Sequence, residues 1–260
     1  MSSQVQLPWA LLRQFVARAI RARFEGTLTG FGWVFLQPLA MLAVYSLMFV
    51  TVLRARLPPG IDVDFVPFLA VALWPWTAFA ESLIQGNTAL QDNAGLLAKV
   101  AMPKAILVIS RVIAAFALHA IGFGLVLLAL PLLGYVIDLR GVPLAFLAMS
   151  LLGVAASGLA LALSTAQVFV RDTAQVLGPV VTIGFFLTPI FYPREMLPIS
   201  LQPLLDINPV TAFVEVIRWG LFDIGEPTWA WTALAWFPAL SVAIGVWIFR
   251  RLSRHVEDFL

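Results

Sequence analysis

Long apolar segments constrain the fold of this chain more than any other feature. They reach or approach the ~20 residues that a helix needs to cross ~30 Å of hydrocarbon. Backbone polar groups find no water at that depth, so such segments form helices. Only 12% of the residues are charged, against about a quarter in soluble domains. We predict an all-α integral membrane protein with six transmembrane helices at Phe31 to Leu53, Phe65 to Ile84, Ala105 to Leu133, Val142 to Phe169, Val176 to Tyr192 and Trp229 to Phe249.

The distribution of basic residues predicts the orientation of these spans. The side that holds both chain ends carries Arg13, Arg18, Arg21, Arg23, Lys99, Lys104, Arg111, Arg171, Arg250, Arg251 and Arg254. The opposite side carries Arg54, Arg56, Arg140, Arg194 and Arg218. Loops rich in Lys and Arg stay in the cytoplasm, so we predict that both termini are cytoplasmic. Residues 1–260 are predicted to form a single transmembrane domain.

An amphipathic segment at residues 8–24 precedes the first span. One face of its helical wheel is polar and carries Arg13, Gln14, Arg18 and Arg21. The opposite face is apolar and carries Trp9, Leu12, Phe15, Val16, Ala19 and Ile20. A helix with these two faces lies in the membrane interface. We predict an interfacial helix on the cytoplasmic leaflet, which either anchors the N-terminus alone or also contacts a cytoplasmic partner.

The common signatures of enzyme chemistry do not occur in this sequence. A P-loop needs glycine before its lysine, whereas Lys99 follows alanine and Lys104 follows proline. The two histidines, His119 and His255, do not have the spacing of a zinc hydrolase site. The acids of the Asp-Val-Asp segment at 62–64 are best explained as a solvated turn. We expect a transport subunit with no catalytic residue, metal or cofactor of its own.

Four residues within the predicted spans are functional candidates. Two of them are ionisable, and ionisable groups inside a membrane are functional candidates by default. Glu81 lies towards the cytoplasmic end of its span and is expected to pair with a basic residue or to extend towards water. His119 is expected to be neutral and bonded to backbone or hydroxyl, with a proton relay as the alternative. Trp74 and Trp76 flank a proline at mid-span, where they either pack around a kink or stack on a ligand such as a sugar ring.

The fifth span ends in the sequence FFLTPIFYP, at residues 185–193. Asn208 followed by Pro209 is a helix start, because asparagine caps and proline suits the first helical position. The helix that follows, to about Phe222, is apolar but too short to cross a bilayer. Non-helical backbone at membrane depth must be buried in protein or line a water-filled cavity. We therefore predict two short re-entrant helices at residues 193–227.

Several motifs resemble the permease subunits of ABC transporters that export O-antigen, capsule or teichoic acid polysaccharides. Near the start these are Arg21, Arg23, Phe24, Gly26, Thr27, Gly30, Trp33 and Pro38. The later ones are NAGLLAKVAMPKAIL (93–107), FVRDTAQVL (169–177), LTPIFYPREMLP (187–198) and INPVTAFVEVIR (207–218). The motifs occur in the same order as in that family, and together they cover nearly the whole chain. Phe24, Glu25 and Thr29 depart from the family pattern.

The resemblance implies a homodimer of permease chains in the bacterial inner membrane, with two ATP-binding cassette subunits that hold ATP and Mg. It implies a lipid-linked polysaccharide substrate, a coupling loop at residues 86–104 and an extracytoplasmic gate at 193–227. Residues implied in the substrate path or gate are Trp74, Trp76, Phe185, Phe186, Phe191, Tyr192 and Trp219. Residues implied in ATPase coupling are Arg13, Arg18, Arg21, Asn93, Lys99, Lys104, Arg171 and Asp172.

Three other functions remain open from the sequence. An exporter of a smaller amphiphile, such as a lipid, drug or oligosaccharide, would have a closed or laterally open lumen instead of a continuous one. An intramembrane transferase acting on a lipid-linked sugar would need clustered acids or a histidine-acid pair at one interface, and none is apparent in the sequence. A secondary transporter is disfavoured by the scarcity of acids within the spans.

Overall fold

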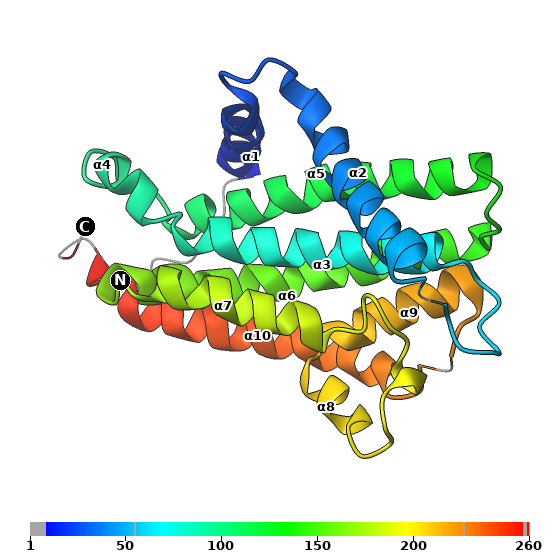
Figure 1. Ribbon diagram of the computed structural model, residues 1–260. Coiled ribbons are helices and arrows are strands. Elements are labelled where there is room, and N and C mark those ends of the chain that lie inside the picture. Colours follow the sequence, from blue (N-terminus) through cyan, green and yellow to red (C-terminus); the bar gives the residue numbers. More distant parts are fainter. Residues whose placement is uncertain (1–8, 55, 226, 257–258, 260) are drawn as a thin grey trace.

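The computed structural model describes residues 9–54, 56–225, 227–256 and 259, and those ranges contain helices and no strand (Figure 1). The all-α prediction is confirmed for them. The α-helices are α1 (Trp9–Phe24), α2 (Trp33–Ser46), α3 (Phe65–Asn87), α4 (Ala94–Leu97), α5 (Ala105–Leu132), α6 (Val142–Phe169), α7 (Thr173–Leu187), α8 (Gln202–Ile207), α9 (Val210–Phe222) and α10 (Ala230–Leu252). Short 3₁₀ turns are η1 (Gly30–Gly32), η3 (Gln91–Asn93), η4 (Leu139–Gly141) and η5 (Arg194–Met196), and η2 (Leu47–Val52) is a π-helical turn.

Within the described residues, five helical segments are long and apolar enough to cross a membrane, so the chain is a multi-pass membrane protein. They are Gly30–Val52, Phe65–Asn87, Ala105–Leu132, Leu139–Phe169 and Ala230–Leu252. The fifth predicted span differs from its expected bounds, because α7 begins at Thr173 and ends at Leu187 instead of running from Val176 to Tyr192. With 15 residues α7 is shorter than the other spans, so the sixth crossing stays a prediction.

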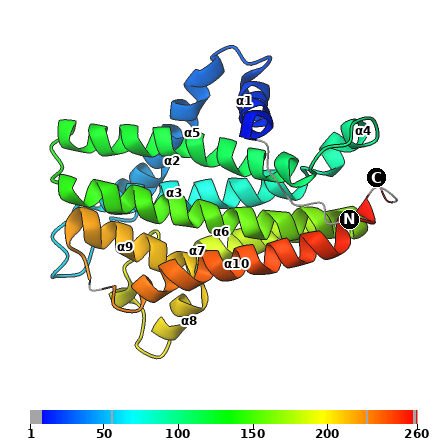
Figure 2. The ribbon, with the colours of Figure 1, turned by 180° about the vertical axis from the view of Figure 1, so that it is seen from behind.

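Helices α3, α5, α6 and α10 lie side by side and form the packed part of the molecule (Figures 1 and 2). Small residues let α6 and α10 approach closely. A Cβ on Gly245 would lie 1.9 Å from the Gly158 carbonyl oxygen, and one on Gly158 would lie 2.4 Å from the Ser241 carbonyl oxygen. Larger side chains would therefore force these two helices apart.

Helices α2 and α7 are loosely packed against the rest of the molecule. Only 6% of the most apolar stretch of the first span is buried, against 78% for α3. In α7, all of which the structure describes, Leu177 is the one buried residue. Both helices therefore present apolar surface to whatever surrounds them.

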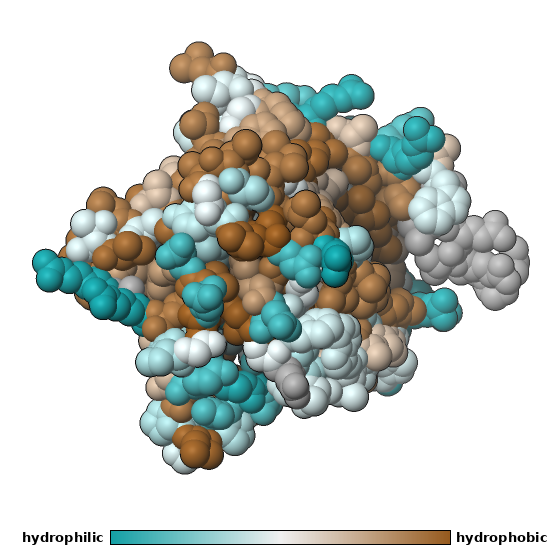
Figure 3. All heavy atoms as spheres, turned by 90° about the vertical axis from the view of Figure 1, so that its right-hand side faces the viewer, coloured by the Kyte–Doolittle hydropathy of each residue, from teal (hydrophilic) through white to brown (hydrophobic). Residues whose placement is uncertain are grey.

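The two ends of the bundle carry different short elements. Helix α4 lies at the end where α10 finishes, whereas α8, α9 and the turn between α5 and α6 lie at the opposite end (Figure 1). Seen from that opposite end, hydrophilic and hydrophobic residues intermingle on the surface (Figure 3). Helix α1 packs along α5 through its buried Leu12, at the extent predicted for the interfacial helix. Residue 8, its predicted first residue, lies outside the described residues.

Candidate functional site

A cavity of about 630 Å³ lies between α2, α3, α5 and α7. Its aromatic lining consists of Trp33, Tyr45, Trp74, Trp76 and Phe185. Its polar lining consists of Arg23, Gln37, Thr77, Glu81, Gln85, His119 and Thr182. The cavity therefore borders both loosely packed helices, and it combines aromatic faces with hydrogen-bonding groups.

Trp74 and Trp76 line this cavity but are themselves largely buried, with 1% and 5% of their surface exposed. A Cβ on Gly184 would lie 2.8 Å from the Trp76 ring, so the glycine allows α7 to pack against that ring. The Trp74 Nε1 group is buried and has no hydrogen-bond partner among the described residues. The two tryptophans thus serve helix packing, and they also leave ring atoms at the cavity wall.

Phe185 and Phe191, two of the predicted gate residues, form an aromatic cluster with residues of the first span. The Phe185 and Phe191 rings lie 5.2 Å apart. Phe191 stacks on Phe49 at 4.7 Å and meets Tyr45 edge-on at 5.2 Å. Tyr45 and Phe49 were not among the predicted path residues, and the signal that could have found them is their i, i+4 spacing along one face of the first span.

The other predicted path residues lie outside the cavity lining. Phe186 is exposed, and its carbonyl oxygen accepts a 2.7 Å hydrogen bond from the Tyr192 hydroxyl. Trp219 packs against Trp231 instead, with 5.5 Å between ring centroids. The structure therefore separates Trp219 from the Phe185 cluster.

The polar end of the cavity is built around the Glu81 carboxylate. It accepts hydrogen bonds from the Arg23 guanidinium, one of them at 3.1 Å, and from the Gln85 side-chain amide. The His119 Nε2 atom lies 2.8 Å from Glu81 Oε2. The predicted pairing of Glu81 with a basic residue is confirmed, and it joins the end of α1 to α3 and α5.

His119 corrects the expectation of a backbone or hydroxyl partner, because its partner is the Glu81 carboxylate. The two residues form a histidine-acid pair that was not apparent from the sequence. Glu81 and His119 are 38 residues apart in sequence, so no local pattern connects them. They face each other because α3 and α5 pack together with these residues at the same depth. Two ionisable residues in adjacent spans were the available signal.

The break at the end of α7 is held together by Arg218 of α9. Its guanidinium donates to the Phe68 carbonyl at 3.1 Å, to the Ile190 carbonyl at 2.9 Å and to the Pro189 carbonyl. The same group lies 3.4 Å from the centroid of the Phe68 ring. Prolines in FFLTPIFYP remove backbone donors and end the helix, and Arg218 satisfies carbonyls that the break leaves without helical partners.

Asn208 closes the same break from the start of α9. Its side-chain oxygen accepts from the Val210 amide at 3.1 Å, which confirms the predicted capping role. Its side-chain nitrogen donates to the Thr188 hydroxyl at 2.7 Å. The segment after α7 is therefore attached directly to α9. A re-entrant position of α8 and α9 in the membrane remains a prediction.

A second arginine, Arg194, ties the 3₁₀ turn η5 to α8 and α9. It donates to Glu215 at 2.9 Å and also pairs with Asp206. Its guanidinium lies 5.4 Å from the centroid of Trp229, whose indole nitrogen donates to Glu215 at 3.1 Å. Burial raises the pKa of the Glu215 carboxyl, and the positive charge of Arg194 opposes that shift only in part.

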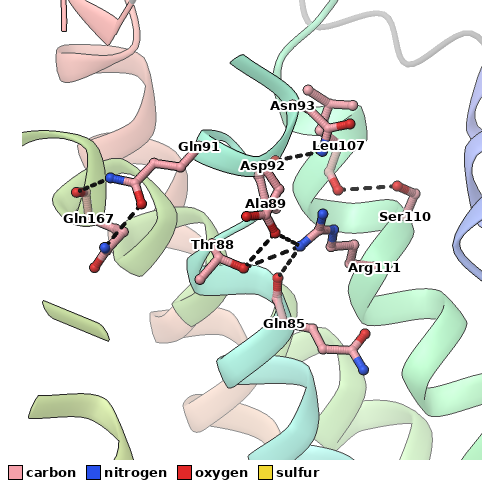
Figure 4. Close-up of polar contacts among 10 residues, drawn as sticks. All are labelled: Gln85, Thr88, Ala89, Gln91, Asp92, Asn93, Leu107, Ser110, Arg111 and Gln167. Atoms are coloured by element: carbon pink, nitrogen blue, oxygen red, sulfur yellow. Dashed lines mark hydrogen bonds and ion pairs between the residues drawn. The ribbon is translucent and has the colours of Figure 1, made fainter. Parts of the chain in front are cut away.

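At the opposite end, Arg111 of α5 holds the turn that leads into α4 (Figure 4). Its Nη1 atom lies 3.2 Å from the Gln85 carbonyl oxygen and 3.3 Å from the Thr88 hydroxyl, and it pairs with Asp92. The Thr88 hydroxyl also donates to Asp92 at 2.8 Å. These contacts fix the first half of the predicted coupling loop to the spans on either side of it.

An amide pair connects the same turn to the end of α6. Gln91 donates to the Gln167 carbonyl at 3.0 Å, and the Gln167 side chain donates back to the Gln91 side-chain oxygen at 3.1 Å (Figure 4). Gln167 also donates to the Arg171 carbonyl at 3.2 Å. The turn is therefore bonded to both α5 and α6, through residues that the sequence analysis did not identify.

The predicted coupling residues differ in their exposure and in their hydrogen-bond partners. Arg13, Arg18 and Arg21 are exposed on α1. Asn93 donates to the Ala89 carbonyl at 2.8 Å, and Lys104 donates to the Ser253 carbonyl at 2.7 Å. Exposed positions are also held by Lys99, Arg171 and Asp172. Apart from Asn93, these residues do not belong to the cluster of Figure 4.

Comparison with known proteins identifies the family. Residues 10–222 match the family described as ABC-2 type transporter. This chain belongs to that family. It is 28% identical over 206 residues to the O-antigen export system permease protein RfbA of Myxococcus xanthus, a match that covers 78% of this chain and 77% of the relative. Two proteins of that name from Klebsiella pneumoniae are 22% and 24% identical over 252 residues, which is 96% of this chain and 95% of each relative.

Membership in the ABC-2 family confirms the resemblance predicted from the motifs. It makes the chain a transport component of an ABC transporter, since the relatives are named as permease proteins. The matched region runs from α1 to the end of α9, so it includes the cavity, the turn before α4 and the break after α7.

Proposed function

We propose that this chain is the channel-forming permease of an ATP-driven exporter, which moves a lipid-linked polysaccharide such as O-antigen out of the cytoplasm. Three relatives carry the name of O-antigen export permeases, and two of them align along nearly the whole chain. The excess of basic residues on one side supports cytoplasmic termini. A bacterial inner membrane is the location that this function requires.

The observation that carries the proposal is the cavity beside α2 and α7. Sugar hydroxyls lose water when they enter hydrocarbon and need other hydrogen-bond partners. The cavity offers Gln37, Thr77 and Thr182 as neutral partners, together with the faces of Trp33 and Tyr45. Aromatic faces hold sugar rings by weak contacts, which allow a polymer to move in steps.

A second copy of the chain would complete the path. Two of the helices that border the cavity, α2 and α7, are also loosely packed: 6% of the first span's most apolar stretch is buried, and Leu177 is the buried residue of α7. An obligate interface resembles a protein core cut in half, and these apolar helices have that character. We therefore place the dimer contact along α2 and α7, with the cavities of both copies facing a shared lumen.

The proposed ATPase partners would act on the end that carries α4. Two ATP-binding cassette subunits would supply ATP and Mg, and their closure would push on the loop at 86–104 and on α1. Arg111 and Gln167 join that loop to α5 and α6. Movement of the loop is thereby transmitted to the spans, and Arg171 and Asp172 lie in the adjoining link to α7.

Transport into inverted membrane vesicles tests the proposal. The chain is co-expressed with its ATPase subunit, and fluorescently labelled lipid-linked polysaccharide is supplied outside the vesicles. We expect a complex of two permease and two ATPase chains, and polymer accumulation that depends on ATP. Absence of a complex, or accumulation without ATP, contradicts the proposal.

One observation favours export of a smaller amphiphile instead. The cavity of about 630 Å³ in one chain lies within the range of ~300–1,000 Å³ typical of sites for single small ligands. The two functions differ in their dependence on substrate length. Equal transport of long and short glycans supports a lumen, whereas transport restricted to single lipid-sized molecules supports the alternative.

A further inference from the structure

A second pocket, of about 360 Å³, lies between α1, the turn before α4 and α5. We name it the α1–α5 pocket. Helix α1 contributes Phe15, Arg18, Ala19, Ala22 and Arg23, the end of α3 and the turn contribute Gln85, Asp92 and Asn93, and α5 contributes Leu107, Ser110 and Arg111. Several of its polar residues are drawn in Figure 4. The pocket is distinct from the cavity beside α2 and α7, although Arg23 and Gln85 border both.

The lining of the α1–α5 pocket is basic. Three guanidinium groups face one carboxylate, that of Asp92. Arg23 is paired with Glu81, and Arg111 is paired with Asp92. Arg18 forms no ion pair within the part of the chain that the structure describes, and it lies 5.9 Å from the centroid of the Phe15 ring. The described lining of the pocket therefore carries an excess of positive charge. Arg18 is the arginine whose donors are not taken up by a described carboxylate.

The shape and lining of the pocket favour a phosphate group attached to a lipid. Guanidinium groups bind phosphate through paired charge-assisted hydrogen bonds, and basic pockets between helices at the cytoplasmic side of a membrane bind anionic headgroups. Phe15, Leu107 and the alanines of α1 supply apolar wall beside the arginines. A free inorganic anion would make no use of that wall.

We propose that the α1–α5 pocket is a binding site for the phosphate group of a membrane lipid. The shared chemistry is a phosphate oxyanion next to hydrocarbon. It is found in anionic phospholipids and in diphosphate-linked lipid carriers alike. The proposal does not depend on the identity of the exported polymer, and it would hold for an exporter of smaller amphiphiles as well.

A lipid bound in this pocket would alter the contacts of the coupling loop through Arg111. Arg111 lines the pocket and also holds Thr88 and Asp92 in the turn before α4. A phosphate beside Arg111 competes with the Asp92 carboxylate for the same donors. A bound lipid would therefore loosen the contact between α5 and the turn. This consequence rests on the proposed function, but binding itself does not.

Lipid retention by the purified full-length chain tests the proposal. The chain is placed in nanodiscs of phosphatidylcholine with phosphatidylglycerol at low mole fraction, and bound lipids are counted by native mass spectrometry after detergent extraction. The key variant is Arg18→Gln. The matched control is Arg21→Gln, which removes the same charge from the same helix at a position outside the α1–α5 pocket.

We expect Arg18→Gln to reduce phosphatidylglycerol retention about tenfold, the effect of losing one charge-assisted hydrogen-bonded contact. Arg21→Gln should change it less than about twofold, as expected for a screened surface charge. Asp92→Asn removes the only acid of the lining and should increase retention. Because that effect has the opposite sign, reduced folding cannot mimic it.

Two competitors identify the source of the phosphate. Inorganic phosphate should not displace phosphatidylglycerol, because it lacks the apolar attachment. A short isoprenyl diphosphate that displaces it at equal or lower concentration supports a carrier lipid, and failure to displace supports a phospholipid. Equal losses in Arg18→Gln and Arg21→Gln, or unchanged retention in Asp92→Asn, overturn the proposal. Normal ATP-driven export by these variants would not change that conclusion, because export tests the proposed function and lipid retention tests the α1–α5 pocket. The two proposals can therefore fail separately.

Discussion

The two ends of this bundle are each organised by an arginine, and the two arginines differ in their surroundings. Arg218, at the end of α7, has 3% of its surface exposed and donates only to backbone carbonyls in the described part of the chain. Arg111, before α4, has 24% of its side chain exposed, and its partner Asp92 has 47% exposed. Water can replace the partners of Arg111, but it cannot replace those of Arg218.

This difference suggests different mechanical roles. Buried polar groups that lose a partner carry the full cost of desolvation, so the contacts around Arg218 form one rigid unit with α3, the break and α9. Partly exposed ion pairs contribute ~1 kcal/mol or less, so the turn before α4 can change its contacts at small cost. A rigid end around Arg218 and an adjustable end around Arg111 suit the proposed mechanism, in which ATPase subunits act on one side of the transporter.

The largest expected effect is that of Arg218→Met. This change removes the guanidinium that donates to the carbonyls of Phe68, Pro189 and Ile190. We expect a loss of ~3 kcal/mol or more, because each buried acceptor left unsatisfied costs ~1–3 kcal/mol. Thermal unfolding of the purified chain in detergent measures it. Arg140→Met, at an exposed site in η4, is the control. Equal melting temperatures for both variants would show that Arg218 does not hold the break together.

The next largest effect is expected for Glu81→Gln, between the two ends. The amide cannot pair with the Arg23 guanidinium as the carboxylate does, so the end of α1 should separate from α3. We expect a loss of ~1–3 kcal/mol, the range for one hydrogen bond to a charged group. Hydrogen exchange of the α1 amides should rise while that of α6 stays unchanged. Equal exchange of the α1 amides in Glu81→Gln and in the unsubstituted chain would mean that α1 is held by its apolar face alone.

Arg111→Gln should have a small effect on stability and a larger one on coupling. The lost ion pair is partly exposed, so we expect a destabilisation of ~1 kcal/mol or less. If the proposed function holds, ATP turnover by the partner subunit continues, but export per ATP falls. Arg111→Lys keeps the charge without the planar fork and should restore part of the export. A parallel fall of turnover and export would indicate loss of assembly instead.

The smallest predicted effect is the pH dependence contributed by Glu215. Burial raises the pKa of this carboxyl above its ordinary value of 4.5, so the folded chain binds a proton at a higher pH than the unfolded chain. The free energy of unfolding should therefore rise as the pH falls from neutral towards 4.5. Glu215→Gln should lack this contribution, as measured by melting temperature against pH. Identical pH profiles would show that Arg194 fully offsets the burial.

The periodic parts of the molecule could be predicted from sequence. Long apolar runs predict spans, and the two faces of residues 8–24 predict the helix α1, because these properties are local. The prolines of FFLTPIFYP indicated the break after α7, which the structure shows after Leu187, whereas the coupling role of residues 86–104 stays a prediction. Asn208 could be predicted as a cap since the capping geometry involves only neighbouring residues.

The contacts between distant elements could not be predicted. Arg218 lies in a helix whose positions are buried on nearly all sides, and an apolar helix with one arginine does not reveal which carbonyls that arginine meets. Those carbonyls belong to Phe68 and to the break, 150 and 28 to 29 residues away. Counting Arg218 among the basic residues of the side opposite the termini therefore missed its burial. Glu81 with His119, and Gln91 with Gln167, depend on tertiary packing in the same way.

Cysteine accessibility tests the central claim, that the cavity beside α2 and α7 is part of the polar path. The chain contains no cysteine, so single substitutions report without background. Thr182→Cys places a thiol in the cavity, and Ser150→Cys places one in the apolar groove between α5 and α6. Both residues are exposed in the single chain.

In membranes that contain the assembled transporter, a hydrophilic thiol reagent should modify Thr182→Cys rapidly, and added polysaccharide should slow that reaction. Ser150→Cys should stay unmodified. Equal reaction at both positions, or no protection of Thr182→Cys by polysaccharide, would contradict the account.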